Sequence, residues 1–467
     1  MTLVESDNLL SKESIEYSDE IIKELFDVKL PLNWNQLKRE EKSKLVHQWA
    51  RKAFPNVPES LVSITVGLTV DGNAAKLMDQ VPEWLDRKKL ACGQKFARDN
   101  IFGIYFSVLL ALFALFSFKE GFKPLIATRK SSEPYTAFKR YLSTGIRVRN
   151  WYTSDFWTKD TPAYNDMIAV RRIHAIVRNK LNGLSKEEVD KAATIKNPWS
   201  PMRNILSQDF WSACSEALPG QCPFAIEHTG SIRPRIMNQG EMAVTQGGFI
   251  CLAILYPQAF GLHAATDKDL DNFCYIWRCI GYLLGIDDEF NFCRGSFADI
   301  KQRSADYLNE WVKPNLRDIT PEWEHMMRCI TASSEYYSSN VSNSSYEIIL
   351  LYLTGLMNLD MPRLRAALSY RDWIRYYFTK FTMYYAMRVP QIKRFAVSQT
   401  NKTLDNASKF TKEKHEKLQD KSSKLLSSAR ADNNIKNIST EDRIIKILLI
   451  FVLLHVVINF FFLISRN

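Results

Sequence analysis

Apolar residues recur three and four positions apart along most of the chain, and this spacing places them on one face of an α-helix. The pattern is clear in IIKELFDVKL, DNFCYIWRCIGYLLGI and EIILLYLTGLMNLDM, and Pro, Gly or Asn stands between successive segments. The alternating patterns that are typical of strands are scarce, and there is neither a repeat of fixed period nor a Gly-rich phosphate loop. The pattern predicts an all-α fold, with one large helical domain from about residue 25 to residue 395.

The last apolar run, residues 447–464 (ILLIFVLLHVVINFFFLI), contains 18 residues and no charge. Because this length crosses a bilayer as a helix, we expect a transmembrane tail anchor. Lys436, Arg443 and Lys446 precede the run and Arg466 alone follows it, a bias that would keep the large domain cytosolic. The alternative is a buried terminal helix, although such a helix usually keeps a polar face.

A second apolar run of the same length, residues 101–118 (IFGIYFSVLLALFALFSF), resembles a second span by hydropathy alone. A helix that is buried on all sides in a large helical core has the same composition. We favour the core helix for this segment.

Composition divides the chain into four parts. We expect an N-terminal helical extension over residues 1–84 and a helical catalytic domain over residues 85–395. Residues 396–446 are rich in Lys, Ser and Asn, as is typical of a linker or a solvated helix, and they lead to the anchor at 447–464.

The net charge is +11, and much of the excess lies in residues 401–437. A nucleic-acid-binding surface needs aromatic side chains among its basic ones, and Phe410 is the only aromatic residue of this segment, so we expect no nucleic acid partner. The eight cysteines show no C-x-x-C spacing, which argues against a zinc ribbon or a disulfide framework and favours reduced core thiols. The N-terminus lacks the basic and apolar regions of a secretory signal.

The segment AVRRIHAIVRN, residues 169–179, predicts a helix because it combines helical apolar spacing with the absence of Gly and Pro. Arg171, His174 and Arg178 are spaced i, i+3 and i+7 and therefore share one face. Two guanidinium groups about one turn away disfavour protonation of the imidazole, so its lone pair is free for a metal or a proton. A structural histidine in the core is the alternative interpretation.

The two arginines also need anions, since a cation on an apolar face must be paired. A ligand with one metal and two carboxylates would satisfy all three residues, and haem b is such a ligand. Its iron would bind His174, and its propionates would bind Arg171 and Arg178. Alternatively, the arginines pair with acidic residues of the same domain.

Upstream, Arg140 and Thr144 are spaced i and i+4 in TAFKRYLSTGIRVRNW and share a helix face. The pattern Arg-x-x-x-Thr, followed thirty residues after the Thr by the His of VRxxHxxVR, resembles the catalytic domain of latex-clearing protein (rubber oxygenase) and the endoplasmic-reticulum-bound mpaB-type oxygenases. The resemblance extends over roughly residues 85–390, and the spacing from Thr to His is its most specific element.

This resemblance implies an all-helical fold that encloses haem b and cleaves isoprenoid carbon–carbon double bonds oxidatively with dioxygen. It implies that His174 is the proximal iron ligand and that Arg140 and Thr144 belong to the distal pocket. It further implies that Arg171 and Arg178 hold the propionates.

The expected protein is therefore a haem-b-dependent oxygenase of the endoplasmic reticulum membrane, with a hydrophobic, isoprenoid or lipid substrate. The resemblance has two departures. The catalytic glutamate proposed for the family has no aligned counterpart here, although Glu133 in RKSSEPYT lies nearby. The second departure is the residue before Thr144. Ser143 stands where the rubber oxygenase has a lysine that can cap the iron, so the sixth iron position is expected to be open or bound to water.

Two other functions stay open at this point. The first is a haem-free, membrane-tethered helical protein that binds lipids or partners. The second is a magnesium-dependent isoprenoid-diphosphate enzyme that uses Asp287 and Asp288. These acids and Glu289 are consecutive and point in different directions, whereas metal-binding acids usually lie one helical turn apart, so capping of a following helix is favoured instead.

Overall fold

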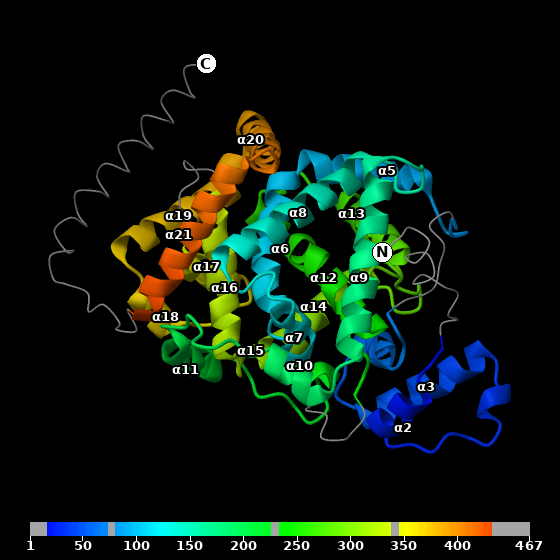
Figure 1. Ribbon diagram of the computed structural model, residues 1–467. Coiled ribbons are helices and arrows are strands. Elements are labelled where there is room, and N and C mark those ends of the chain that lie inside the picture. The colour runs from blue at the N-terminus through cyan, green and yellow to red at the C-terminus, as the bar shows by residue number, and fades with distance from the viewer. Residues whose placement is uncertain (1–15, 73–79, 226–232, 338–344, 432–467) are drawn as a thin grey trace.

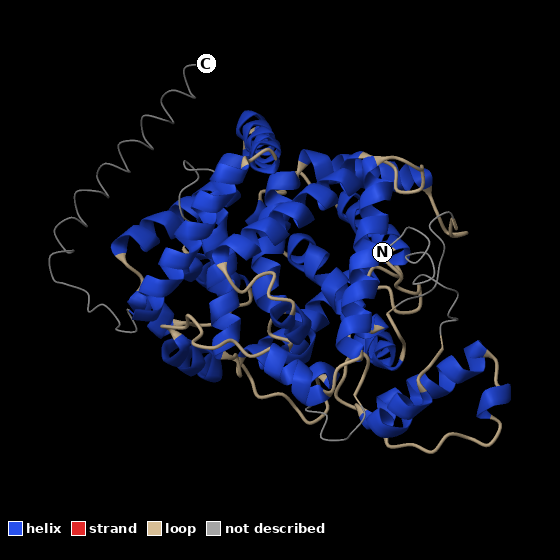
Figure 2. Cartoon of the chain, in the orientation of Figure 1, coloured by secondary structure: helices blue, strands red, loops and turns tan. Residues whose placement is uncertain are grey.

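The computed structural model describes four stretches of the chain: residues 16–72, 80–225, 233–337 and 345–431. All regular elements of these stretches are helices, apart from one isolated bridge between Tyr17 and Val70 (Figures 1 and 2). The prediction of an all-α fold is confirmed.

The α-helices follow one another in this order: α2 (Asp19–Phe26), α3 (Arg39–Ala53), α4 (Val62–Val66), α5 (Arg87–Asp99), α6 (Ile101–Leu115), α7 (Lys119–Ala127), α8 (Pro134–Thr153), α9 (Pro162–Asn182), α10 (Lys186–Ala192), α11 (Arg203–Ala213), α12 (Gln239–Leu255), α13 (Asp267–Leu283), α14 (Phe297–Asp306), α15 (Lys313–Leu316), α16 (Pro321–Ser333), α17 (Tyr346–Leu356), α18 (Pro362–Ala367), α19 (Tyr370–Tyr384), α20 (Pro390–Ser408) and α21 (Lys412–Ala431). Shorter helical turns join them: η1 (Trp34–Gln36), η2 (Glu59–Leu61), η3 (Gly67–Thr69), η4 (Pro223–Ala225), η5 (Pro257–Phe260), the π-helical η6 (Tyr307–Val312), η7 (Ser334–Tyr336) and η8 (Ala386–Arg388).

Helix α12 is the centre of the core, and most of its side chains are buried. It packs along α6 and also contacts α4, α13 and α14 (Figure 1). A Cβ atom at Gly240 would lie 2.6 Å from the carbonyl oxygen of Ile64, so only glycine allows this approach between α12 and α4. The N-terminal segment that was expected as an extension therefore shares the main core.

Helix α6 forms a core helix over residues 101–115, as we favoured. Its buried residues include Ile104, Leu110 and Phe113, and it lies against α12 and α17. No single helix of the described stretches is long and apolar enough to cross a membrane. Helices α5 and α6 meet at 85°, and taken together as a bent pair they have the length and composition of a membrane span.

The expected boundary at residue 395 falls inside α20, and α21 continues the folded part to Ala431. The Tyr135 N–H of α8 donates to Ser422 Oγ at 3.1 Å, and Leu404 and Leu418 are buried in a small cluster against α8. The sequence did not predict these contacts, because the apolar residues that form them are widely spaced among many Lys, Ser and Asn residues. The rest of the expected linker and the anchor at 447–464 lie outside the described residues.

All eight cysteines are free, and only Cys92 is exposed. Burial raises the pKa of the Cys214 and Cys251 thiols to about 12, so both stay protonated near neutral pH. The expectation of reduced core thiols is confirmed.

Candidate functional site

Helices α8 and α9 carry the residues that the sequence singled out, and they pack side by side. α9 starts with Pro162 in its first turn, and the Thr161 hydroxyl accepts a hydrogen bond from the Tyr164 N–H at 3.2 Å. Asn150 near the end of α8 donates to Asp166 near the start of α9 at 2.8 Å. The two helices therefore run antiparallel.

One face of α9 is directed into the protein. Arg171 and Arg178 are both buried on it, as the i and i+7 spacing predicted, and His174 lies between them. The other buried residues of this helix are Ala163, Met167, Ala175 and Leu181. Ile176 on the opposite side is exposed, which fixes the orientation of the helix.

One nitrogen of the His174 imidazole lacks a partner among the described residues. Its Nδ1 atom is buried and forms no hydrogen bond with any described residue. Burial lowers the pKa of His174 to about 4, and the charges of Arg178 and Arg140 act in the same direction. The ring is therefore neutral at physiological pH and has a nitrogen lone pair available.

His174 also differs from its neighbours in accessibility. Met167, Arg171, Ala175 and Arg178 on the same face are buried, whereas His174 keeps part of its surface accessible. We call the region around His174 on the inward face of α9 the α9 space.

Helix α12 has a matching stripe. Glu241, Thr245 and Phe249 lie one turn apart and keep accessible surface on a helix that is otherwise mostly buried. At one end of the stripe, the charge of Arg233 acts on Glu241, and Arg233 donates to the Leu181 carbonyl of α9 at 3.2 Å.

The other end of the stripe lies toward the opposite end of α9. Phe249 stacks on Trp277 with 4.2 Å between ring centroids, and Trp277 lies 6.4 Å from Trp151 of α8. The contact between Trp277 and Trp151 thus connects this end of the stripe with the end of α8, which lies beside the start of α9. In Figure 1, α12 lies between α6 and α9.

Two further predicted site residues come from α8. The charge of Arg140 lowers the pKa of His174, so Arg140 lies on the same side, and its Nη1 donates to Ser131 Oγ at 3.2 Å. Thr144 is half-buried, and its hydroxyl forms no hydrogen bond with a described residue. Ser143 beside it is likewise half-buried. Arg140 and His174 are therefore close enough to interact electrostatically, whereas no contact joins Thr144 to either of them.

The two arginines of α9 have partners within the protein. Arg171 Nη1 donates to the Leu283 carbonyl at 3.2 Å, and burial lowers the pKa of its guanidinium. Arg178 Nη1 lies 3.3 Å from Asp71 Oδ1, and Arg235 lies 3.3 Å from the second oxygen of the same carboxylate. The alternative of pairing with an acid of the same domain therefore holds for Arg178.

A pocket of about 440 Å³ opens at the C-terminal end of α9. Its lining includes Arg178, Arg233 and Arg235, with Asp71 as the single acidic residue among those that line it. The three guanidinium groups exceed the one carboxylate, so the pocket favours an anion.

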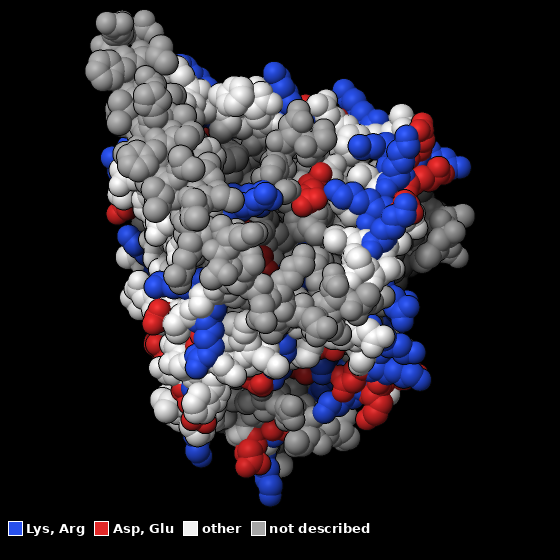
Figure 3. All heavy atoms as spheres, turned by 90° about the vertical axis from the view of Figure 1, so that its left-hand side faces the viewer, with Lys and Arg blue, Asp and Glu red and all other residues white. Residues whose placement is uncertain are grey.

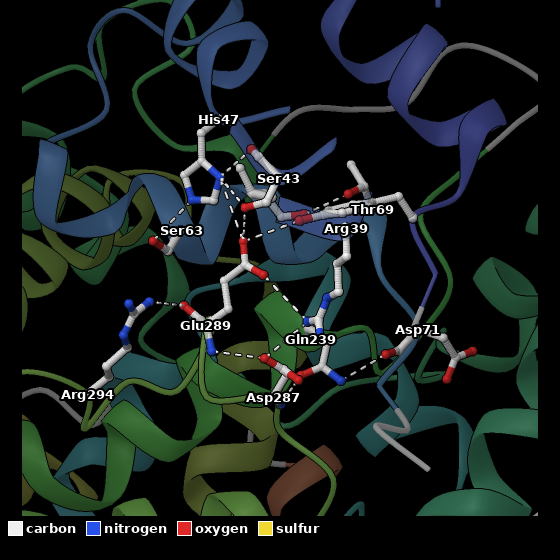
Figure 4. A network of polar contacts seen from close by, with 12 residues as sticks. Arg39, Ser43, His47, Ser63, Thr69, Asp71, Gln239, Asp287, Glu289 and Arg294 are labelled. Atoms are coloured by element: carbon white, nitrogen blue, oxygen red, sulfur yellow. Dashed lines mark hydrogen bonds and ion pairs between the residues drawn. The ribbon is translucent and has the colours of Figure 1, made fainter. Parts of the chain in front are cut away.

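The acidic run 287–289 belongs to a separate polar network, which Figure 4 shows. Asp287 lies 3.2 Å from Arg39, and Asp288 accepts two hydrogen bonds from Arg278 at 2.9 and 2.8 Å. Glu289 accepts hydrogen bonds from the hydroxyl groups of Ser43 and Tyr17. Asp287 and Glu289 thus share Arg39, which also lies 3.5 Å from Glu289, whereas Asp288 is bound to Arg278.

The described residues contain no group of three or more His, Cys, Asp and Glu residues that could hold a metal ion. The expectation that the acidic run caps a following helix is wrong, because α14 starts at Phe297 and its N-cap is Ser296. The run instead lies in the loop after α13, where it binds the N-terminal segment.

Sequence reasoning missed two residues in this region. Gln239 in the first turn of α12 joins three backbone groups: its side chain donates to the carbonyls of Asp71 and Gly285 at 2.9 Å and accepts from the Asp287 N–H at 2.9 Å. Glu241 was also missed, and burial raises its pKa to about 7. The capping pattern Asn238-x-x-Glu241 was a local signal for its position, but nothing in the sequence indicated its burial.

The inward face of α9 thus combines a neutral imidazole with fixed positive charge, and the stripe of α12 adds the aromatic side chain of Phe249. Such a site can bind a large apolar ligand that carries an acceptor for the imidazole lone pair and one or more anionic groups. No family model, curated protein or solved structure matches this chain.

Proposed function

We propose that this protein is a haem-b-dependent oxygenase that acts on a hydrophobic, isoprenoid or lipid substrate. The observation that carries the proposal is His174, a neutral imidazole with an unpartnered buried nitrogen on the inward face of α9. Neutral imidazole is a common ligand of iron.

The other residues around the α9 space fit the same cofactor. Arg171 and Arg178 are cations buried on either side of His174, and they would hold the two propionates. Arg178 shares Asp71 with Arg235, so the positive charge exceeds the negative charge and a propionate can join the pair. When bound, the haem would supply the chemistry that activates dioxygen.

The protein itself would bind and orient the substrate, and it would exclude water from the site. Arg140 holds a fixed positive charge near His174, which favours negative charge on a bound group. The free hydroxyl of Thr144 can donate a hydrogen bond to a polar atom of the ligand. Phe249 and the apolar side chains of α6 would position the hydrocarbon part of a substrate and keep water away from the reacting double bond.

The membrane part of the proposal rests on the sequence. The uncharged run 447–464 would anchor the chain in the endoplasmic reticulum membrane and leave the helical domain cytosolic. A lipid or isoprenoid substrate could then reach the domain from the bilayer. The haem-free lipid-binding protein stays the competing function, because the apolar side chains that would position a hydrocarbon substrate would also suit a lipid.

The test is the visible absorption spectrum of the full chain, purified in detergent and supplemented with haem. We expect a Soret band that His174→Ala abolishes and that added imidazole restores, since free imidazole can occupy the space that the side chain leaves. The matched control is His263→Ala, because His263 is bonded to the Met383 carbonyl at 2.7 Å and lies in another part of the fold. A folded wild-type chain that binds no haem would overturn the proposal in favour of the lipid-binding function.

A further inference from the structure

Helix α19 carries apolar side chains on the side that faces away from the core. Tyr377 and Phe378 are each 62% exposed, and Tyr385 just beyond the helix is 60% exposed. Ile374 and Phe381 are partly exposed and fall on the same side of the helix by their spacing. We call these five residues the aromatic face of α19.

The opposite side of α19 holds the helix on the protein. Tyr376 and Met383 are buried, and α19 packs on α17 and η5. The aromatic face is therefore not an unfolded or poorly packed segment. It is the outer side of a well-anchored helix, and a soluble protein rarely leaves so many large aromatic side chains together on its surface.

Basic residues surround this face. Between residues 370 and 394, the acidic side chain is Asp372 alone, and it is engaged by Ser369 and Ser345. The basic side chains that flank the aromatic face in this segment are Arg371, Arg375, Lys380 and Arg388. Lys380 lies 5.2 Å from the Tyr376 ring, and Arg388 lies 5.5 Å from the Tyr385 ring.

Amphipathic helices that lie on a membrane combine these two features. Aromatic rings enter the boundary between headgroups and acyl chains, while lysine and arginine bind anionic headgroups. Long basic side chains beside aromatic rings can reach the headgroups while their stems stay in the apolar layer. A protein partner for this face would need matching acids and a fitted groove, whereas a bilayer requires only apolar side chains and positive charge.

The chain beyond α21 also favours a bilayer. Fifteen residues separate Ala431 from the apolar run that begins at residue 447, and fully extended they span at most about 50 Å. If the run enters a membrane, it holds the helical domain within that distance of the lipid surface. Figure 3 shows the side of the molecule to which α19 belongs, with Lys and Arg side chains on its visible part.

We propose that the aromatic face of α19 docks on the surface of an anionic phospholipid bilayer. The inference does not depend on haem or on oxygenase activity. It gives the helical domain a second contact with the membrane, besides the anchor, and thereby a fixed orientation on it.

The experiment places a polarity-sensitive fluorophore on the face. In the full chain with Cys92→Ser, the other cysteines are buried, so Phe378→Cys provides one accessible thiol for labelling. The control is Trp211→Cys, because Trp211 is also exposed (64%) and also has a cation over its ring, Arg317 at 4.4 Å. Both labelled chains are reconstituted in phosphatidylcholine vesicles with and without phosphatidylserine.

We expect a blue shift of the label at residue 378 in vesicles that contain phosphatidylserine, and its reversal at high salt. The label at residue 211 should not respond. Lys380→Gln and Arg371→Gln should each lower the docking equilibrium constant about fivefold, the factor that corresponds to one basic side chain near an anionic surface.

Two results would overturn the proposal. In the first, the label at residue 378 stays in a water-like environment while the chain floats with the vesicles. In the second, its shift appears without vesicles and grows with protein concentration, which would assign the face to a second copy of this chain.

Discussion

The α9 space and the network around Glu289 each contain a histidine, and the two histidines differ in their partners. His47 in the network has both ring nitrogens engaged, Nδ1 with the Ser43 carbonyl at 2.9 Å and Nε2 with Ser63 Oγ at 3.3 Å. His174 in the α9 space is different, because its Nδ1 is buried and has no partner among the described residues. Burial also lowers the pKa of the His174 imidazole.

The difference separates a structural role from a binding role. Buried polar groups are normally satisfied within the protein, because an unmet hydrogen bond costs about 1–3 kcal/mol. The network around Glu289 follows this rule and fastens the N-terminal segment to the loop after α13 (Figure 4). The Nδ1 atom of His174 departs from this rule, and the proposed haem site rests on that departure.

The largest expected effect concerns the pH dependence of stability in the haem-free protein. The folded-state pKa of His174 is about 4 and its ordinary value is 6.5, so the unfolded chain binds more protons between these values. The histidine therefore lowers the free energy of unfolding as the pH falls from about 6.5 to 4, by about 3 kcal/mol. Denaturant unfolding of His174→Gln should lack this contribution.

Glu241 acts in the opposite direction over a similar range, because its folded-state pKa is raised to about 7. The free energy of unfolding should therefore be compared between wild type and His174→Gln at each pH. The contribution of Glu241 is the same in both proteins and cancels in the difference. If the difference in the free energy of unfolding stays constant from pH 7 to pH 4, the assignment of a binding role to His174 and a structural role to His47 is contradicted.

A smaller effect is expected when Glu289 is truncated. Glu289→Ala should lower the free energy of unfolding by about 2 kcal/mol, because it leaves the hydroxyl groups of Ser43 and Tyr17 and the guanidinium of Arg39 without this acceptor. Haem affinity, measured by spectral titration, should stay at the wild-type value. Loss of haem binding in a folded variant would show that the network and the α9 space are one site.

Asp71→Asn tests the link between the two regions, since Asp71 pairs with Arg178 and its backbone carbonyl binds Gln239. We expect a loss of about 1 kcal/mol in stability without haem, in keeping with a partly exposed ion pair. Haem should bind several-fold more tightly, because a competing carboxylate has been removed from Arg178. Weaker haem binding would argue against a propionate at this arginine.

The smallest effect is expected for Thr144→Val. The Thr144 hydroxyl bonds no described residue, so stability in denaturant should change by less than about 0.5 kcal/mol. Under the proposed function, consumption of dioxygen with an isoprenoid substrate should fall while the Soret band is retained. Thr144→Ser, which keeps the hydroxyl, is the matched control and should keep most of the activity.

Local periodicity predicted the parts of the fold that depend on neighbours in sequence. The shared face of Arg171, His174 and Arg178 belongs to this class, because helical spacing fixes it. The core helix at 101–115 was favoured over a membrane span partly on the family resemblance, since its composition fits both. The role of Arg178 as a partner of Asp71 could not be predicted, since the two residues are far apart in the sequence. The same holds for Ser43 and Glu289, which are 246 residues apart.

The approach of α12 to α4 at Gly240 has a consequence for how the chain folds. The N-terminal segment is synthesised first, but its contacts with Gly240 and Glu289 become possible only after more than half of the chain has been made. Contacts of such high sequence separation close late and slow the search for the native state. Residues 16–72 can therefore complete their packing only once the centre of the core has been made, and a chaperone that shields their apolar side chains during synthesis would speed productive folding.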